Sequence, residues 1–211
     1  MGFVMSIAEP KVRRKDPAER RAEIVSAASR IAVTEGLERV TAKRVAEQLG
    51  VVPGLVNHYF SAVDDLVAAA FGFATQLERA EIYRLASLAG SPLEQLRRLL
   101  GELLDAKRDA VSLLWLDAWQ ASRRRPALLV EVGNQMDADA LALSGLIEAG
   151  VTAREFVSTD PSASAVRVMA LVDGYGVQAA ARSRRDSSIV AEFALRVTET
   201  ELGLKALALS I

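Results

Sequence analysis

The 211-residue chain has no cysteine and only one histidine, His58. The lack of cysteine excludes disulfides, thiolate catalysis and cysteine-based zinc sites, and a lone histidine excludes a histidine-cluster metal site. No apolar run approaches the roughly 20 residues that a membrane-spanning helix needs, and the first residues do not form a signal peptide. We therefore expect a cytoplasmic protein without a membrane partner, a metal or another cofactor.

Strand-like alternation is also scarce, whereas apolar residues recur at helical spacing through most of the chain. Hydrophobic residues make up 51% of the sequence, enough for a core at this length. The pattern predicts an all-α fold of about nine helices, with Gly133 and Gly145 leaving room for a kink in the seventh. The expected helices cover 17–35, 42–49, 53–60, 64–89, 92–105, a run from the break at 107–109 to about 124, 126–149, 160–184 and 187–202.

The stretch from Thr41 to Phe60 reads as two short helices joined by a tight turn. Thr41 suits an N-cap, Gly50 tolerates the positive φ at which a helix ends, and Pro53 suits a first helical turn. The second helix has a small, polar outer face, and a helix of this kind fits the DNA major groove. On geometry alone, an ordinary αα-hairpin is an equal alternative.

A preceding helix, 17–35, carries an apolar stripe that must pack across this hairpin. With that helix included, residues 20–71 resemble the N-terminal domain of the tetracycline-repressor (TetR) family of transcription regulators. The Asn-His-Tyr-Phe end of the second hairpin helix is closest to the betaine-regulator (BetI-like) branch. The matching residues are Ile24, Ala27, Ala28, Gly36, Thr41, Val45, Ala46, Gly50, Val51, Gly54, Tyr59, Phe60 and Leu66.

The resemblance implies three segments: a basic arm at 1–16, a helix-turn-helix domain at 17–62, and an effector-binding and dimerisation domain at 63–211. Phosphates and base edges of an operator would be contacted from the hairpin, with Gly54, Asn57 and His58 among the residues that face the bases. The implied DNA-contact residues are Thr41, Ala42, Lys43, Arg44, Pro53, Gly54, Leu55, Asn57, His58 and Tyr59.

Three residues depart from the family pattern. Val52 stands where a capping Ser or Thr is usual, Asn57 where Tyr is frequent, and Val63 where a phosphate-binding Lys is usual. The net charge of −1 is also not that of a basic protein, but Lys11–Arg21 holds six basic residues against two acids. Such an arm can contact phosphates, and a merely solvated tail is the alternative.

The helix expected at 162–181 is apolar on nearly every side, so it must be covered all round. A second subunit could cover one side of it, giving a four-helix interface in a homodimer, as the resemblance also implies. A buried central helix in a monomer is the alternative. The interface residues we expect are Val168, Leu171, Val172, Tyr175, Ala179, Ile189, Phe193 and Val197.

Trp115 and Trp119 lie one helical turn apart and therefore share a face, with Asp117 on the opposite one. In the family, helices at this point enclose an effector pocket, and two indoles could stack on a flat ligand or help to cage a quaternary ammonium. Ordinary core packing is the alternative. The residues expected at the pocket are Trp115, Trp119, Met136, Phe156, Met169 and Tyr175.

An enzyme would need a nucleophile–base pair, paired carboxylates or a phosphate-cradling loop, and none of these is recognisable. The sequence therefore predicts a small-molecule-responsive transcriptional regulator, a repressor that binds a palindromic double-stranded DNA operator as a homodimer. A helical protein–protein adaptor without sequence-specific DNA binding is the alternative.

Overall fold

A computed structural model describes residues 16–105, 108–180 and 187–210. Three predicted segments lie outside these residues. They are residues 1–15 of the predicted arm, residue 107 at the start of the predicted break, and residues 181–184 at the end of the eighth predicted helix. The described chain contains helices and no strand, which confirms the all-α expectation. The elements are α1 (Pro17–Glu35), the 3-10 helix η1 (Leu37–Arg39), α2 (Ala42–Leu49), α3 (Pro53–Tyr59), α4 (Val63–Ala86), α5 (Pro92–Leu103), α6 (Asp109–Ser122), α7 (Pro126–Thr152), α8 (Pro161–Ala180) and α9 (Ser187–Glu201).

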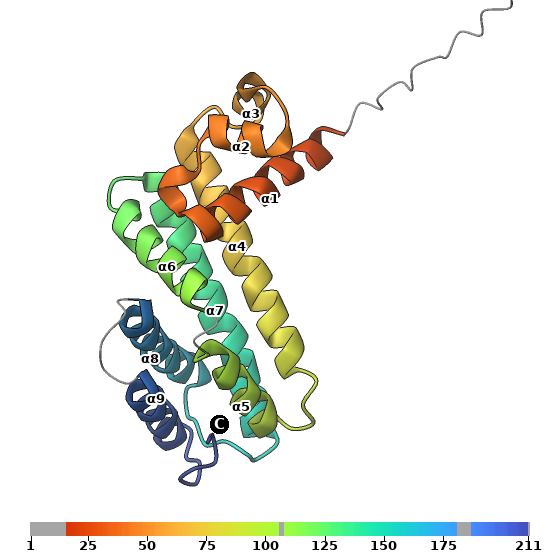
Figure 1. Ribbon diagram of the computed structural model, residues 1–211. Coiled ribbons are helices and arrows are strands. Elements are labelled where there is room, and N and C mark those ends of the chain that lie inside the picture. The colour runs from red at the N-terminus through yellow and green to blue at the C-terminus, as the bar shows by residue number, and fades with distance from the viewer. Residues whose placement is uncertain (1–15, 106–107, 181–186, 211) are drawn as a thin grey trace, which may run out of the picture.

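The molecule is elongated, with α4 and α7 running side by side along its length (Figure 1). Helices α1, α2 and α3 lie at one end, and α5, α8 and α9 lie toward the other, with α6 between them. None of the helices in the described ranges is long and apolar enough to cross a membrane.

The ends of α1 and α2 follow from their sequence. The Asp16 carboxylate accepts a hydrogen bond from the Ala18 N–H at 2.8 Å, and the Glu19 carboxylate reaches back to the Asp16 N–H, which makes a capping box. Gly50 ends α2 with φ 66°, in the left-handed region where a side chain is disfavoured. These boundaries agree with the sequence prediction.

Two long helices differ from prediction. Helix α4 ends at Ala86 rather than near residue 89, and a short turn joins it to α5, which Ser91 caps by accepting from the Glu94 N–H. Helix α7 runs unbroken past Gly150 to Thr152. Gly150 therefore ends no helix. It allows a close approach instead, since a Cβ there would lie 2.0 Å from the Phe156 ring.

The buried side chains form two main clusters. The upper core joins α1–α3 and the first half of α4 to Leu114 and Ala118 of α6 and to Leu128 and Val132 of α7. The lower core joins the end of α4 to α5, α7 and α8. Helices α4 and α7 therefore contribute to both cores, and the packing around the hairpin does not stop where α4 begins.

Candidate DNA-binding surface and ligand cavity

The hairpin α2–α3 presents an exposed face on a buried frame. Val45, Ala46 and Val56 are fully buried against α1 and α4. On α3, Pro53, Gly54, Asn57 and His58 are exposed, whereas Leu55 and Tyr59 are half-buried. A Cβ at Gly54 would meet nothing within 4 Å, so this turn of the helix is open to an incoming molecule. The face is narrow and polar at Asn57 and His58, which suits a DNA groove.

The polar side chains at the start of α2 differ in whether they already have a partner within the subunit. The Thr41 hydroxyl accepts a hydrogen bond from the Arg44 N–H at 3.1 Å, which caps α2. The Arg44 guanidinium donates to both carboxylate oxygens of Glu35, at 2.5 and 3.0 Å, and holds the pKa of that carboxyl below its usual value. Lys43 is exposed and beside it. Of the two cations predicted for phosphate contact, Lys43 is the one that the fold leaves available.

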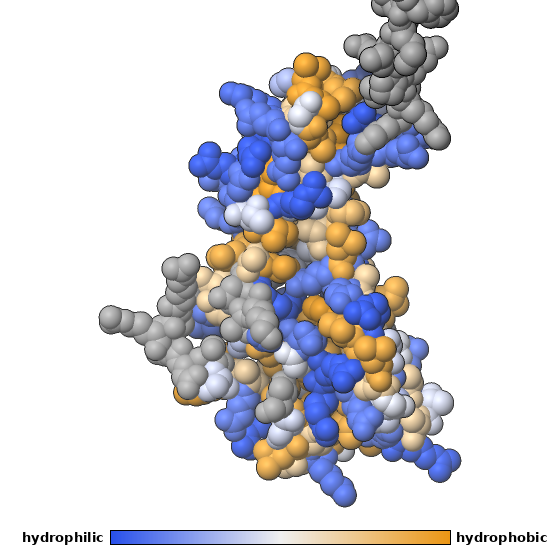
Figure 2. Space-filling view, turned by 45° about the vertical axis from the view of Figure 1, so that its right-hand side comes forward, coloured by the Kyte–Doolittle hydropathy of each residue, from blue (hydrophilic) through white to orange (hydrophobic). Residues whose placement is uncertain are grey.

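Two of the three departures from the family pattern put exposed apolar groups at this end. Val52 is 70% exposed and precedes α3 without a side-chain cap, and Val63 opens α4 at 46% exposure. Figure 2 shows hydrophobic side chains at this end of the molecule between hydrophilic flanks. These positions offer neither charge nor a hydrogen-bond donor to a phosphate, so α3 and α4 begin without a cation of their own.

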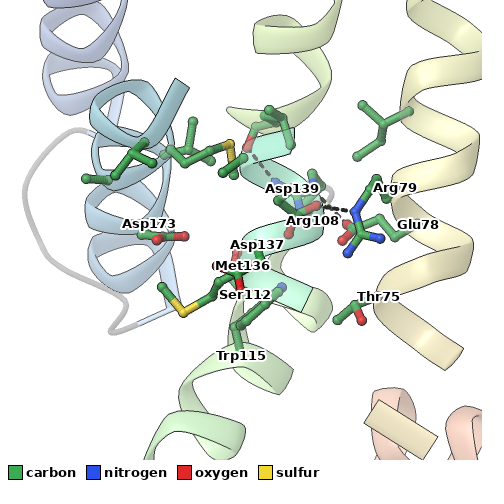
Figure 3. A pocket seen from close by; sticks show the side chains of 18 of the residues that line it. Thr75, Glu78, Arg79, Arg108, Ser112, Trp115, Met136, Asp137, Asp139 and Asp173 are labelled. Atoms are coloured by element: carbon green, nitrogen blue, oxygen red, sulfur yellow. Dashed lines mark hydrogen bonds and ion pairs between the residues drawn. The ribbon is translucent and has the colours of Figure 1, made fainter. Parts of the chain in front are cut away.

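A cavity of about 230 Å³ lies between α4, α6, α7 and α8. Four of the six residues that the sequence predicted there, Trp115, Trp119, Met136 and Met169, line it. Figure 3 shows Trp115 and Met136 among the lining side chains. The other two predicted residues do not line the cavity. Phe156 is buried in the lower core against Gly150, and Tyr175 is buried beside Leu104 and Ala194. Their side chains fill the subunit's own packing, so their assignment to this cavity is corrected.

The tryptophans are both cavity wall and core. Trp115 and Trp119 have ring centroids 5.6 Å apart and planes tilted by 43°. Both are half-buried and pack against the upper core. The sequence left open whether the two tryptophans line a pocket or belong to the core, and in the structure they do both.

Ionised side chains bridge the helices around the cavity. The Arg79 guanidinium on α4 donates to the Asp139 carboxylate and the Gln135 side chain on α7. Arg108, which precedes α6, donates to the Glu78 carboxylate on α4 at 2.7 Å. Burial raises the pKa of Asp139 despite this pairing. Burial and the Asp139 carboxylate also raise the pKa of the Tyr83 hydroxyl.

Asp173 on α8 differs from these groups, because the described residues give it no hydrogen bond or ion pair. Burial, followed by the nearby Asp139 carboxylate, raises its pKa to about 6. Among the described residues, the cavity lining contains four carboxylates (Glu78, Asp137, Asp139 and Asp173) and two guanidiniums, Arg79 and Arg108. Asp173 thus adds a carboxylate opposite the arginine bridges (Figure 3), and the Arg108 charge lowers its pKa by less than burial and Asp139 raise it.

Sequence reasoning missed this charged half of the cavity. A signal for Asp173 was present, because it is the only acidic residue in α8, a helix of mainly apolar residues. The bridging pairs had no such signal, since charged side chains on long helices usually mark a solvated face.

The predicted interface residues lie on different sides of α8 and α9. Ile189 and Phe193 of α9 are 66% and 60% exposed. Leu171, Ala179 and Val197 are half-buried, whereas Val168, Val172 and Tyr175 are buried within the subunit. The assignment of those three to a subunit surface is therefore corrected, because an apolar helix gave no sign of which side faces inward. Val166, Ala170 and Val177 of α8 are exposed and belong to the lining of the cavity, and Gly174 is exposed beside them.

Two family models match the chain. Residues 24–70 match the bacterial regulatory proteins of the tetR family, and residues 92–202 match the C-terminal domain of BetI-type transcriptional repressors. The transcriptional regulator BetI 1 of Chromohalobacter salexigens is 30% identical over 112 residues, 52% of this chain and 55% of the relative. BetI of Escherichia coli K12 is 27% identical over 167 residues, 76% of this chain and 82% of the relative. The chain thus spans about half the length of the first of these relatives.

Solved structures resemble the fold over most of the chain. A TetR-family regulator from Rhodococcus sp. has a TM-score of 0.72 at 23% identity and covers 88% of this chain and 99% of its own. A transcriptional regulator from Saccharomonospora viridis, solved in complex with choline, has a TM-score of 0.70 at 21% identity and covers 88% of this chain and 98% of its own. At these identities the likeness concerns the fold alone.

Proposed function

Since the chain belongs to the TetR family of bacterial regulatory proteins, with a BetI-type C-terminal domain, we propose that it is a ligand-responsive transcriptional repressor. It binds a palindromic operator in the cytoplasm as a homodimer. Proteins of this family are transcription regulators and not enzymes. The observation that carries the proposal is the exposed face of α3, held outward by a frame that is buried on its other side.

The twofold symmetry of a dimer matches the symmetry of a palindrome. In the DNA-competent state, two α3 helices enter successive major grooves about 34–36 Å apart. An effector in the cavity shifts the population toward a different separation, in proportion to its difference in affinity for the two states. Helix α4 suits this role because it lines the cavity at Thr75, Arg79 and Tyr83 and begins beside α3.

The effector that best fits the cavity is a small organic cation with an apolar body. Asp173 supplies a partly buried carboxylate to which the described residues give no hydrogen bond or ion pair, and Trp115 and Trp119 supply ring faces that attract a cation. The choline bound to the structurally similar S. viridis protein belongs to this chemical class. A cation that lacks N–H donors makes no strong hydrogen bonds to water, so ring faces can compensate for the hydration water that it loses on binding.

DNA binding is tested with the duplex upstream of the protein's own coding region. A gel shift across a range of salt concentrations, with excess competitor DNA, should reveal one retained site and a footprint with twofold symmetry. Specific binders of this kind hold their site about 10³–10⁷-fold more tightly than other DNA. The helical adaptor alternative requires equal affinity for all duplexes, lost together at moderate salt.

The effector class is tested with choline and its neutral isostere 3,3-dimethylbutan-1-ol. Both tryptophans of the chain line the cavity, so intrinsic fluorescence reports directly on occupancy. Choline should quench or shift this fluorescence at a concentration at which the isostere has no effect. Equal responses to both compounds would contradict a cation site and leave the DNA-binding proposal intact.

A further inference from the structure

Three consecutive arginines, Arg123, Arg124 and Arg125, form the turn between α6 and α7. The turn has a fixed backbone, because the Arg124 N–H donates to the Ala121 carbonyl at 3.0 Å and the Arg125 N–H donates to the Ser122 carbonyl at 3.2 Å. Helix α7 begins directly after it, and Leu128 on its first turn is fully buried in the upper core. The arginine turn is therefore anchored to the same upper core that supports the hairpin.

The turn lies beside the start of α4. The Arg125 guanidinium donates to the Asp64 carboxylate at 3.1 Å, and Asp64 is the second residue of α4. Only three residues, 60–62, separate α4 from α3. Figure 1 places the α6–α7 connection at the end of the molecule that carries α1, α2 and α3. The arginine turn thus flanks the surface that faces DNA.

Local structure accounts for two of the three charges. Arg125 is paired with Asp64. Arg123 is the C-cap residue of α6, where a cation interacts favourably with the helix dipole. Arg124 has neither role. It is exposed, and the described residues offer its guanidinium no hydrogen bond or ion pair.

We propose that Arg124 binds a phosphate of the operator backbone next to the bases read by α3. This inference rests on the proposed DNA binding and adds a contact made by the C-terminal domain. Guanidinium is suited to phosphate, because its planar N–H groups match the phosphate oxygens. The starts of α3 and α4 lack this charge, since Val52 and Val63 are apolar, and on α2 Lys43 is available whereas Arg44 is engaged by Glu35. The arginine turn supplies the cation that the starts of α3 and α4 do not.

The test is the salt dependence of operator affinity for the Arg124→Gln variant. Each phosphate contact contributes about 0.9 to the slope of log K against log salt concentration. A symmetric dimer should therefore lose about 1.8 in slope, and nonspecific duplex should lose affinity similarly because the contact does not read bases. Arg124→Lys, which keeps the charge, should retain most of the slope.

Arg84→Gln is the matched control, because it removes the same charge from an exposed residue at the opposite end of α4. It should keep the wild-type slope, and all variants should melt at the wild-type temperature. An unchanged slope in Arg124→Gln, or an equal loss in Arg84→Gln, would overturn the proposed contact. Failure of the wild-type protein to prefer any site would instead contradict the proposed function.

Discussion

Trp115 and Phe71 pack at right angles, with ring centroids 4.9 Å apart and planes at 89°. Trp115 lines the cavity, whereas Phe71 is fully buried in the upper core on α4. One aromatic contact therefore joins the wall that would hold an effector to the packing that supports the hairpin. On the other side of α6, Asp117 lies against the end of α1, where its carboxylate would be 3.3 Å from a Cβ at Gly36. Helix α6 thus contacts both the cavity and the end of α1, which packs on the hairpin.

Phe71→Leu should weaken the effect of cavity occupancy on operator binding while leaving both the cavity and the hairpin folded. Losing an aromatic pair costs about 0.5–1.5 kcal/mol beyond the change in buried area, so the protein should remain folded. Choline should still bind, as followed by tryptophan fluorescence, but should change operator affinity less than it does in the wild type. Phe73→Leu is the control, since Phe73 is half-buried on the same helix outside the aromatic contact. If choline changed operator affinity equally in both variants, the contact between Phe71 and Trp115 would not link the cavity to the hairpin.

The fold was predictable where local signals agree. The Asp16 capping box, Gly50 and Pro53 each mark a helix end by their own chemistry, and the structure keeps those ends. Gly150 led to a wrong prediction of the end of α7, because a glycine is also used where another segment of the chain packs too closely for a side chain. Here the Phe156 ring takes the space of the missing side chain, which is a tertiary cause that no local pattern records.

The site was predictable only in its apolar half. Helical spacing places Trp115 and Trp119 on one face, and both line the cavity. The bridge between Arg79 and Asp139 joins residues 60 positions apart, and a single sequence gives no sign of such a pairing. On α8 the direction of the core decides which residues are buried. An apolar helix carries no polar stripe to mark that direction.

The residues of the DNA-reading face should separate into two classes. Asn57→Ala should relax base preference at one or two positions of the operator, because Asn57 is exposed on α3 and an amide reads base edges. Lys43→Ala should weaken binding to all sequences alike and lower the salt slope by about 0.9 per contact. Binding to a panel of single-base operator variants at two salt concentrations distinguishes the classes. Uniform weakening by both changes would contradict this division.

The outer face of α9 should hold the dimer together. Phe193 is 60% exposed in the single subunit, so Phe193→Arg leaves the subunit's own packing intact and places a charge at the proposed interface. Light scattering should then report a monomer. Leu171→Arg is less informative, because Leu171 is half-buried against the cluster around Tyr175 and the change would disturb the fold. Leu88→Arg, at a residue 66% exposed near the far end of α4, should stay dimeric. A dimeric Phe193→Arg protein would place the interface elsewhere.

Asp173 should make stability and effector binding respond to pH in opposite directions. Its pKa rises from an ordinary value of 3.8 to about 6 in the folded protein, chiefly through burial. The folded state therefore favours the neutral acid. This contribution to stability is fully present below about pH 4 and is lost as the pH rises through about 6. A bound cation favours the carboxylate instead, so choline affinity should increase over the same interval, by at most about tenfold per pH unit.

Asp173→Asn separates this group from the other charges around the cavity, Glu78, Arg79, Arg108, Asp137 and Asp139. The amide cannot ionise, so the variant should melt at a higher temperature than the wild type at pH 8 and at nearly the same temperature at pH 4. Its choline affinity should be low at both values. Asp137→Asn, which changes an exposed carboxylate of the same cavity, should retain the wild-type pH dependence of both properties. If Asp173→Asn binds choline as tightly as the wild type at pH 8, the cation is held by the tryptophan faces alone, and the assignment of Asp173 as its counter-ion fails.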